Sequence, residues 1–217
     1  MKIQSLNVAL PRLLAWQGQT FKTGIFKEPV QGPVMMRRLD LDGDRQADLS
    51  VHGGPYKAVY AYPMEHYSCW RKELPDMDLP WGAFGENLTT EGLDEAGTHI
   101  GDRFRIGAAT VMVTQPRLPC FKLAAKFQRD DIVKRFLSSG RSGFYFSVVE
   151  EGMVAAGDPI ERIHEDESRI SVSDINNLFR NGTDQALMRR VTQLEPLPAD
   201  WRQHFIEQLA ELERETA

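Results

Sequence analysis

A cysteine in a cationic, proline-containing segment is the strongest chemical feature of the sequence. Cys120 closes the segment TQPRLPC, with Arg117 three residues before it and Lys122 two residues after it. A thiol acts as a nucleophile or metal ligand in its thiolate form, which neighbouring cations favour. The two prolines restrict the backbone and remove amide donors, which predicts a stiff loop after the preceding strand. Cys120 is therefore either a reactive thiol or a small buried hydrophobic residue, which is the usual role of a cysteine outside a disulfide.

A histidine beside paired glycines is the second chemical feature. His52, Gly53 and Gly54 stand shortly before Lys57. Paired glycines let a backbone approach a ligand closely and present amides to an anion, and a histidine can donate a proton near neutral pH. The alternative is a tight turn with a surface histidine. In a binding site, His52 would be the proton donor and Lys57 an anion contact.

Two further polar segments suit a heterocycle and a phosphate group. The segment FGENL contains Gly85 and Asn87, and the Asn87 amide can both donate to and accept from a heterocycle edge. Glu86 between them could instead orient a neighbouring loop. Arg141 and Ser142 combine a guanidinium with a hydroxyl at the start of a strand, a pair that could hold a phosphate. The same residues could equally form a glycine-rich connection between a helix and a strand.

The elements that must position these residues are mainly strands up to about residue 165. β-Branched and aromatic residues between turn signals predict strands at 58–62, 109–113 and 144–149. Gly-Asp pairs at 101–102 and 157–158 each precede alternating apolar residues, which predicts a turn followed by a strand. Helices are predicted at 64–74, 121–127 and 130–137.

The character of the chain changes to helix after residue 170. Ser173 and Thr183 are the predicted N-caps of two helices, and Gly182 is a stop signal between them. A last helix is predicted over 201–213, because apolar residues recur there at helical spacing and would form one buried face: Trp201, Phe205, Leu209 and Leu212.

Three blocks in this order resemble the MOSC domain, which is named for its occurrence at the C-terminus of molybdenum-cofactor sulfurase. They are residues 40–62, the segment FGENLTTEGL at 84–93, and QPRLPC at 115–120. The helical tail is similar to the extension of stand-alone YiiM-type members. The resemblance implies a mainly β fold with peripheral helices (α+β). Residues 1–168 would form a MOSC β-barrel domain, and residues 169–217 a small C-terminal three-helix element.

The resemblance also implies a cofactor, a reaction and the residues that serve them. The pocket would bind the molybdenum cofactor (molybdopterin) with Cys120 as molybdenum ligand and catalytic residue. His52 would be the second catalytic residue, and the cofactor contacts would be Lys57, Gly85, Asn87, Arg117, Lys122, Arg141 and Ser142. The implied reaction reduces N-hydroxylated small molecules, such as hydroxylaminopurine bases, to amines. Pyridoxal phosphate binding is a further family-level expectation.

The implied reaction needs two electrons and two protons, and two other functions stay open. The sequence contains no flavin, haem or iron-sulfur motif, so an external flavoprotein reductase would be the electron donor. Alternatively, Cys120 could carry a persulfide in sulfur transfer, for which the same thiolate-favouring setting is suitable. A third interpretation makes the domain a non-enzymatic carrier or sensor of the cofactor.

Composition and charge limit the remaining function classes. The 217 residues, 41% hydrophobic and 26% charged, fit one globular domain with a small appendage. A net charge of −5 argues against a surface that binds nucleic-acid duplexes, which requires clustered Lys and Arg. The lack of an apolar leader or membrane-length run predicts a cytoplasmic protein without membrane contact, in which Cys69 and Cys120 are reduced. A homodimer built by the tail helices is a further possibility.

Overall fold

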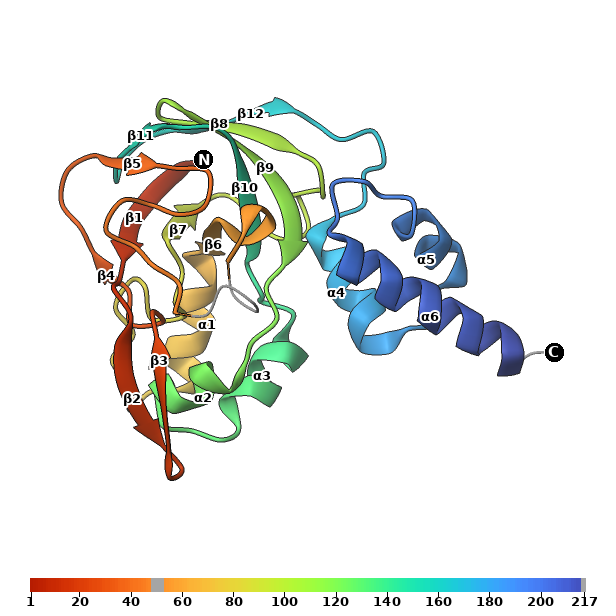
Figure 1. The fold of residues 1–217 in the computed structure, drawn as a ribbon, viewed down its shortest axis with the longest axis horizontal. Helices are drawn as coiled ribbons and strands as arrows, with labels where there is room; N and C mark the ends of the chain where they lie inside the picture. Colours follow the sequence, from red (N-terminus) through yellow and green to blue (C-terminus); the bar gives the residue numbers. More distant parts are fainter. Residues whose placement is uncertain (48–52, 216–217) are drawn as a thin grey trace.

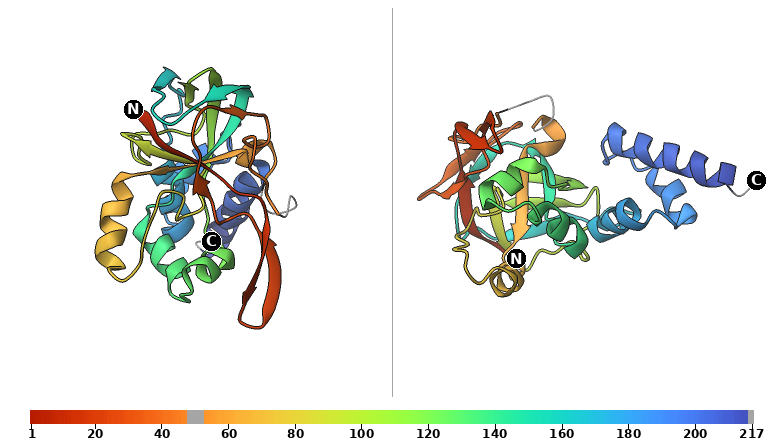
Figure 2. Two further views of the ribbon diagram at one scale, coloured as in Figure 1. Left: turned by 90° about the vertical axis from the view of Figure 1, so that its left-hand side faces the viewer. Right: turned by 90° about the horizontal axis from the view of Figure 1, so that it is seen from below.

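The computed structural model describes residues 1–47 and 53–215, and the fold is a mixed α+β arrangement. An eight-stranded sheet forms the body, helices lie around one end of it, and the last three helices project to one side (Figure 1). The turned views in Figure 2 show the same projection and a long hairpin that extends from the body. No helix of the described chain is long and apolar enough to cross a membrane.

Short strands and helices of moderate length make up the described residues. The strands are β1 (Lys2–Val8), β2 (Arg12–Trp16), β3 (Gln19–Thr23), β4 (Glu28–Pro29), β5 (Val34–Met36), β6 (Val59–Pro63), β7 (Leu88–Glu91), β8 (Arg103–Ile106), β9 (Ala109–Pro116), β10 (Phe144–Glu150), β11 (Gly152–Val154) and β12 (Ile160–His164). The helices are the 3₁₀ turn η1 (Pro55–Lys57) and α1 (Glu65–Glu73), α2 (Phe121–Phe127), α3 (Ile132–Ser139), α4 (Val172–Asn181), α5 (Gln185–Val191) and α6 (Ala199–Glu215).

The main sheet is open, so the predicted β-barrel is wrong. Its strand order is β12-β8-β9-β10-β6-β7-β1-β4, with β6 and β7 parallel and the other pairs antiparallel. Within the described residues, β12 and β4 end the sheet and do not pair with each other. An isolated bridge between Lys2 and Pro159 brings the start of β1 close to the start of β12. Three backbone hydrogen bonds accompany this bridge, from Ile3 to Asp158, from Gly157 to Ile3 and from Ile160 to Met1, so the sheet curls strongly, but the pairing does not continue into a closing ladder.

The local predictions around the cysteine agree with the structure, with one difference. The strand predicted at 58–62 is β6, that at 144–149 is β10, and the helices predicted at 64–74, 121–127 and 130–137 are α1, α2 and α3. The strand predicted at 109–113 continues to Pro116, past the point where the prolines were expected to start a loop. Tyr145 pairs with Gln115 and Phe144 with Pro116, so the β10 ladder carries β9 to the edge of the site. A proline is tolerated there because it stands at the strand end.

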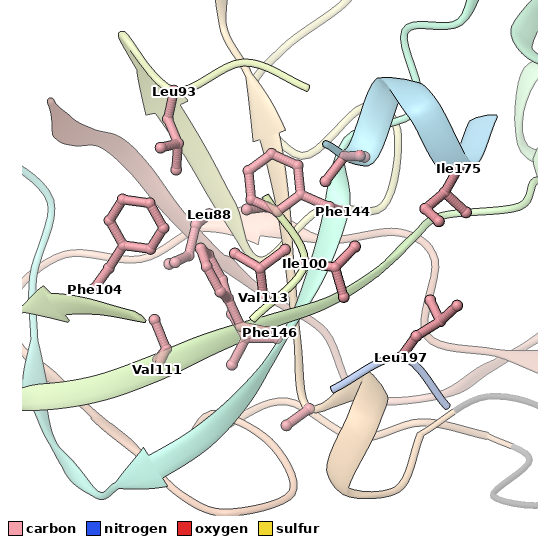
Figure 3. Close-up of a cluster of buried hydrophobic side chains, with 14 of the residues drawn as sticks. Leu88, Leu93, Ile100, Phe104, Val111, Val113, Phe144, Phe146, Ile175 and Leu197 are labelled. Atoms are coloured by element: carbon pink, nitrogen blue, oxygen red, sulfur yellow. The ribbon is translucent and has the colours of Figure 1, made fainter. Parts of the chain in front are cut away.

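The central strands separate a hydrophobic core from an aromatic cluster. In β6, Val59 and Ala61 belong to the main core, and Tyr60 and Tyr62 belong to the aromatic cluster under α1, α2 and α3. Successive residues of a strand point to opposite faces of the sheet, so β6 contributes side chains to the core on one face and to the aromatic cluster on the other. Figure 3 shows the core side, where residues of β9 and β10 meet those of neighbouring strands and of the C-terminal helices.

The C-terminal helices pack on the sheet through this same core. Ile175 of α4 and Leu197, before α6, belong to one buried cluster with Val113 and Phe144 (Figure 3). The predicted stripe of α6 is confirmed, because Trp201, Phe205 and Leu209 are buried in that cluster and Leu212 packs against it. The division into residues 1–168 and 169–217 stays a prediction.

The N-caps of α4 and α5 differ from the predicted residues. Ser171, rather than Ser173, caps α4, and Asp184, rather than Thr183, caps α5. The Ser171 hydroxyl accepts from the Asp174 amide at 3.0 Å, and the Asp174 carboxylate accepts from the Ser171 amide at 2.9 Å. This capping box satisfies two backbone donors reciprocally, which a start at Ser173 would not do. Gly182 ends α4 in the left-handed conformation, as predicted.

A buried carboxylate organises the loop that leads into β7. Glu86 accepts from the amides of Gly82 at 2.8 Å and Phe84 at 3.1 Å, and from the Thr89 hydroxyl at 2.9 Å. The Tyr67 hydroxyl is a fourth donor. Burial raises the pKa of Tyr67 far above its usual value and the Glu86 charge adds to the rise, so the phenol keeps the proton that it donates. Glu86 thus has the loop-orienting role that the sequence left open.

Replacing Ser171 by alanine removes one half of the capping box. We expect Ser171→Ala to lower the free energy of unfolding by about 1 kcal/mol, because the Asp174 amide loses its acceptor. Ser173→Ala is the matched control and should change it by less than about 0.5 kcal/mol. Urea unfolding followed by circular dichroism measures both, and a larger loss in Ser173→Ala would contradict the assigned cap.

Replacing Glu86 by glutamine keeps the size of the side chain but turns one acceptor into a donor. We expect Glu86→Gln to cost about 2 to 3 kcal/mol of stability, because buried amide and hydroxyl donors lose an acceptor. Glu91→Gln is the control, since Glu91 forms an exposed pair with Lys2 and should contribute less than about 0.5 kcal/mol. Equal unfolding midpoints for the two variants would refute this role of Glu86.

Candidate anion-binding site

A cavity of about 100 Å³ opens on the tyrosine face of the central strands. Tyr60 of β6 and Tyr145 of β10 form part of its wall, with ring centroids 5.2 Å apart. Its described lining is Thr23, Gly24, Ile25, Lys27, Arg45, Gln46, Ala47, Gly53, Lys57, Tyr60, Gly85, Asn87, Arg117, Leu118, Cys120, Lys122 and Tyr145. The cavity therefore gathers segments that are far apart in the sequence at the end of β9.

Most of the predicted site residues meet at this cavity. Its lining includes Cys120, and among the predicted cofactor contacts it includes Lys57, Gly85, Asn87, Arg117 and Lys122. Their roles toward a cofactor stay predictions. His52 lies outside the described residues, although the neighbouring Gly53 belongs to the lining.

Arg141 and Ser142 are not brought to this cavity. The Arg141 guanidinium pairs with Glu73 of α1 and lies 4.3 Å from the centre of the Trp70 ring. The Ser142 hydroxyl accepts from Asn176 of α4 at 2.8 Å and donates to the Gly143 carbonyl at 2.6 Å. Arg141 thus contacts α1, and Ser142 contacts α4. These contacts agree with the alternative interpretation of the sequence, in which the two residues form a structural connection between a helix and a strand.

Cys120 stands at the junction between β9 and the α2 helix. It is the N-cap residue of α2, with extended backbone angles, and its carbonyl accepts from the Leu123 amide at 2.9 Å. Cys120 is half-buried, Cys69 is exposed, and both are thiols. The helix start thus fixes the backbone of a cysteine at the cavity wall.

Arg117 is a buried cation with an unused donor. It is only 6% exposed, and its guanidinium lies 5.2 Å from the Tyr60 ring centre and 5.0 Å from that of Phe136. Among the described residues, its Nη1 atom has no hydrogen-bond partner. A buried donor left unsatisfied costs free energy, so this atom is suited to an acceptor supplied by a ligand.

Tyr145 couples electrostatically to both Arg117 and Cys120. Burial raises the pKa of Tyr145, the Arg117 charge and hydrogen bond oppose the rise, and a negative charge on Cys120 adds to it. The hydroxyl is therefore protonated at neutral pH and can donate toward the cavity. Sequence reasoning missed Tyr145 and Tyr60. The alternation of apolar and tyrosine residues in β6 and β10 was the signal that could have identified them.

Gln115 is a second buried polar group that sequence reasoning missed. Neither polar atom of its side-chain amide has a partner among the described residues, and the residue is 1% exposed. Gln115 is paired with Tyr145 in the ladder, and paired residues share a face of the sheet. Its side chain is therefore on the same face of the sheet as Tyr145.

Lys27 and Arg45 are further missed residues, and each is paired with a carboxylate. Lys27 Nζ lies 2.5 Å from one oxygen of Asp44, which is fully buried, and Arg45 Nη1 lies 2.8 Å from Asp40. Burial lowers the pKa of Lys27, and Asp44 opposes this change. Single basic residues in loops give no periodic signal, which explains why the sequence did not reveal them.

Asn87 and Gly85 hold neighbouring segments of the cavity wall together. The Asn87 amide donates to Asp44 at 2.9 Å and to the Asn7 carbonyl at 3.3 Å, and its oxygen accepts from the Tyr60 amide at 3.1 Å. Gly85 has a positive φ of 84°, and a Cβ atom there would lie 2.8 Å from the Ile25 side chain. Only glycine fits this conformation and approach without strain.

The charge of the described lining selects for an anion. It contains Lys27, Arg45, Lys57, Arg117 and Lys122 and no carboxylate. Among the described residues, Arg117 and Lys122 form no ion pair with a carboxylate. Grouped cations with a buried, unsatisfied guanidinium are typical of a site for a phosphorylated or otherwise anionic molecule.

Three comparisons relate the chain to known proteins. It is 42% identical over 205 residues to the uncharacterized protein YflK of Bacillus subtilis, covering 94% of this chain and 92% of that protein. It is 34% identical over 181 residues to a protein named reductase from Gibberella moniliformis, covering 82% of this chain but only 32% of the fungal protein. The crystal structure of YiiM from Geobacillus stearothermophilus superposes with a TM-score of 0.81 at 34% identity, covering 96% of this chain and 98% of that one.

The family follows from the fold, the site and these relatives together. The MOSC domain model matches residues 48–161, a range that includes β6 to β11 and the cavity residues Lys57, Gly85, Asn87, Arg117 and Cys120. The helices after it are also part of the likeness to YiiM, because that structure covers nearly the whole chain. The chain belongs to the MOSC domain family.

Proposed function

We propose that this protein is an oxidoreductase that binds the molybdenum cofactor in the cationic cavity and reduces N-hydroxylated small molecules to amines. Cys120 is the proposed molybdenum ligand. The electrons come from an external flavoprotein reductase in this proposal. Membership of the MOSC family and the fungal relative named reductase support the reaction class.

The observation that carries the proposal is the grouping of a cysteine with cations around one cavity. Cys120, Arg117 and Lys122 line the same cavity, and Arg117 Nη1 has no partner among the described residues. A soft thiolate is a suitable ligand for a metal that is already held by sulfur, and cations offset an anionic cofactor. The chemistry of these residues, a thiol among cations, therefore matches a metal cofactor that carries negative charge.

The donor set of the described chain also fits a metal that arrives with its own ligands. No group of three His, Cys, Asp or Glu residues in the described chain is arranged to hold a metal ion. A metal at Cys120 would thus need further ligands from a partner molecule, and the dithiolene of molybdopterin supplies two. When bound, the cofactor supplies the exchange of two electrons.

The residues of the chain bind the anion, shape the cavity and provide protons. Reduction of an N-hydroxyl group breaks the N–O bond and releases water, so it consumes two protons with the two electrons. His52 is the proposed proton donor because it stands next to Gly53, which lines the cavity. Tyr145 can hold the substrate hydroxyl, since its own hydroxyl stays protonated.

The test combines metal analysis with turnover. The protein is produced in cells that make the cofactor, its molybdenum is measured by mass spectrometry, and a hydroxylaminopurine is supplied with a flavoprotein reductase. We expect near-stoichiometric molybdenum and formation of the aminopurine. Molybdenum without turnover on any N-hydroxylated compound would favour a carrier or sensor. Cyanide-labile sulfur without molybdenum would favour sulfur transfer by Cys120, and either result would reject the reductase.

Replacing the cavity cysteine tests the metal ligand. Cys120→Ser exchanges a soft thiolate for a hard, protonated hydroxyl, so we expect molybdenum content or turnover to fall at least about tenfold while folding is preserved. Cys69→Ser is the matched control, because Cys69 is exposed on α1 and away from the lining, and it should leave both values unchanged. Full molybdenum content and full activity in Cys120→Ser would exclude this ligand.

Replacing an arginine inside or outside the cavity tests the anion contact. Arg117→Gln should weaken cofactor retention by one or two decades, because a charge-assisted hydrogen bond in a buried site contributes about 1 to 3 kcal/mol. Arg141→Gln is the control, since Arg141 is occupied by Glu73 and Trp70. Molybdenum content after serial dilution is the measurement, with thermal unfolding to verify both folds. Equal losses in the two variants would place the anion contact elsewhere.

A further inference from the structure

A second cavity lies beside the first and has a different character. Its volume is about 310 Å³, within the size range of small-molecule sites. Lys27 lines both cavities, so the two are neighbours. The second is lined mainly by apolar side chains, together with two lysines and two carboxylates: Phe26, Lys27, Glu28, Met77, Asp78, Leu79, Pro80, Ala83, Lys126 and Phe127.

Lys126 reaches this cavity from α2, and two backbone carbonyls hold its amine. Nζ donates to the Ile25 carbonyl at 2.9 Å and to the Gly82 carbonyl at 2.7 Å. A neutral amine has two N–H groups and one lone pair, so these two acceptors satisfy it completely. An ammonium group has a third N–H, and no carboxylate of the described residues forms an ion pair with Lys126; the Phe26 ring, with its centre 5.6 Å from Nζ, is the remaining contact that could offset a charge. Carbonyl oxygens can accept from either form of the amine, so burial without a carboxylate partner is what disfavours the charged form.

The charges around Lys126 act in the same direction. Burial lowers its pKa to about 7. Glu86 opposes this change, and the positive charges of Arg117, Lys27 and Arg12 add to it. Glu28 and Asp78 are the carboxylates of the cavity lining, and neither forms an ion pair with the amine. Near neutral pH a large share of Lys126 is thus unprotonated, in contrast to an exposed lysine.

We infer that Lys126 is a nucleophilic amine that forms an imine with a small apolar aldehyde held in the second cavity. Desolvation and neighbouring cations are the two conditions that make lysines reactive toward carbonyl compounds. Phe26, Met77, Leu79 and Phe127 provide apolar contacts for the hydrocarbon part of the aldehyde. This site is separate from the proposed reductase chemistry, and it involves neither Cys120 nor a metal.

The condensation balances without an additional reactant. The lone pair of Nζ attacks the carbonyl carbon, and the C–N bond forms as the carbonyl π bond opens to a carbinolamine. Loss of water then removes the former carbonyl oxygen together with both amine protons and leaves the C=N bond. No electrons are gained or lost. The neutral imine has no N–H, and when it takes up a proton from water the resulting N–H can donate to the carbonyl of Ile25 or Gly82.

Reductive trapping of the full-length protein tests the inference. The protein is incubated with limiting pentanal and cyanoborohydride at pH 7, and the mass increment on each lysine is quantified by peptide mapping. We expect Lys126 to be modified at least about ten times faster than Lys134, an exposed lysine of α3. The ratio of the Lys126 rate to the Lys134 rate should be largest near pH 7 and fall as the pH is raised, because the deprotonation of Lys126 is nearly complete above its pKa of about 7. Lys126 modification no faster than that of Lys134 would overturn the inference.

Two variants separate a bound aldehyde from general reactivity. Met77→Trp fills the cavity without altering the lysine, and it should suppress modification of Lys126 and leave that of Lys134 unchanged. Lys134→Arg is the control and should leave the Lys126 rate as it is. Unchanged Lys126 labelling in Met77→Trp would show that the second cavity does not hold the aldehyde. Because the readout is a mass increment, the outcome does not depend on whether the protein binds molybdenum.

Discussion

The strand register of β6 and β10 is the constraint on which the rest of the structure depends. Val59, Ala61, Phe144 and Phe146 face the core, and the residues between them face the aromatic cluster and the cavity. Because strand side chains alternate with a period of two, a shift of one residue would exchange the two sets. The core would then contain tyrosine hydroxyls, and the cavity would lose the wall on which the Arg117 guanidinium rests. Core packing and site geometry are therefore fixed by the same pairing.

Two buried carboxylates, Glu86 and Asp44, hold the segments around the cavity in place, although neither lines the cavity itself. Glu86 accepts only neutral donors, so its charge organises a loop and neutralises no cavity cation directly. Asp44 holds Lys27, Asn87 and the Ala9 amide together, and this joins the N-terminal segment to the central strands. The described lining itself contains no carboxylate. The protein thus uses its negative groups as scaffold, pairs Lys27 and Arg45 of the lining with carboxylates, and leaves Arg117 and Lys122 without an ion pair among the described residues.

The sequence predicted the parts of the molecule that depend on local information. The bounds of α2 follow from local periodicity and composition, and the cavity residues Cys120, Arg117 and Asn87 stand in recognisable segments. Barrel closure was wrongly predicted, because it depends on pairing between the first and last strands, which no local pattern encodes. Arg141 pairs with Glu73, which is 68 residues away in the sequence, and a local pattern could not predict this pairing either. Ser171 replaced Ser173 as the cap because only the former pairs reciprocally with Asp174.

Two lysines in adjoining cavities illustrate how partners decide the chemistry of the same group. Burial lowers the pKa of both Lys27 and Lys126. Lys27 contacts both oxygens of Asp44 at 2.5 and 2.6 Å, so it belongs to a neutral pair that ties the two cavity walls together. Lys126 donates to two carbonyl oxygens and lies over the Phe26 ring, and none of these groups carries the full negative charge that would balance an ammonium ion. Both lysines are buried, so burial does not distinguish them. The carboxylate of Asp44 makes Lys27 a structural cation, and the lack of such a partner among the described residues makes Lys126 the proposed reactive amine.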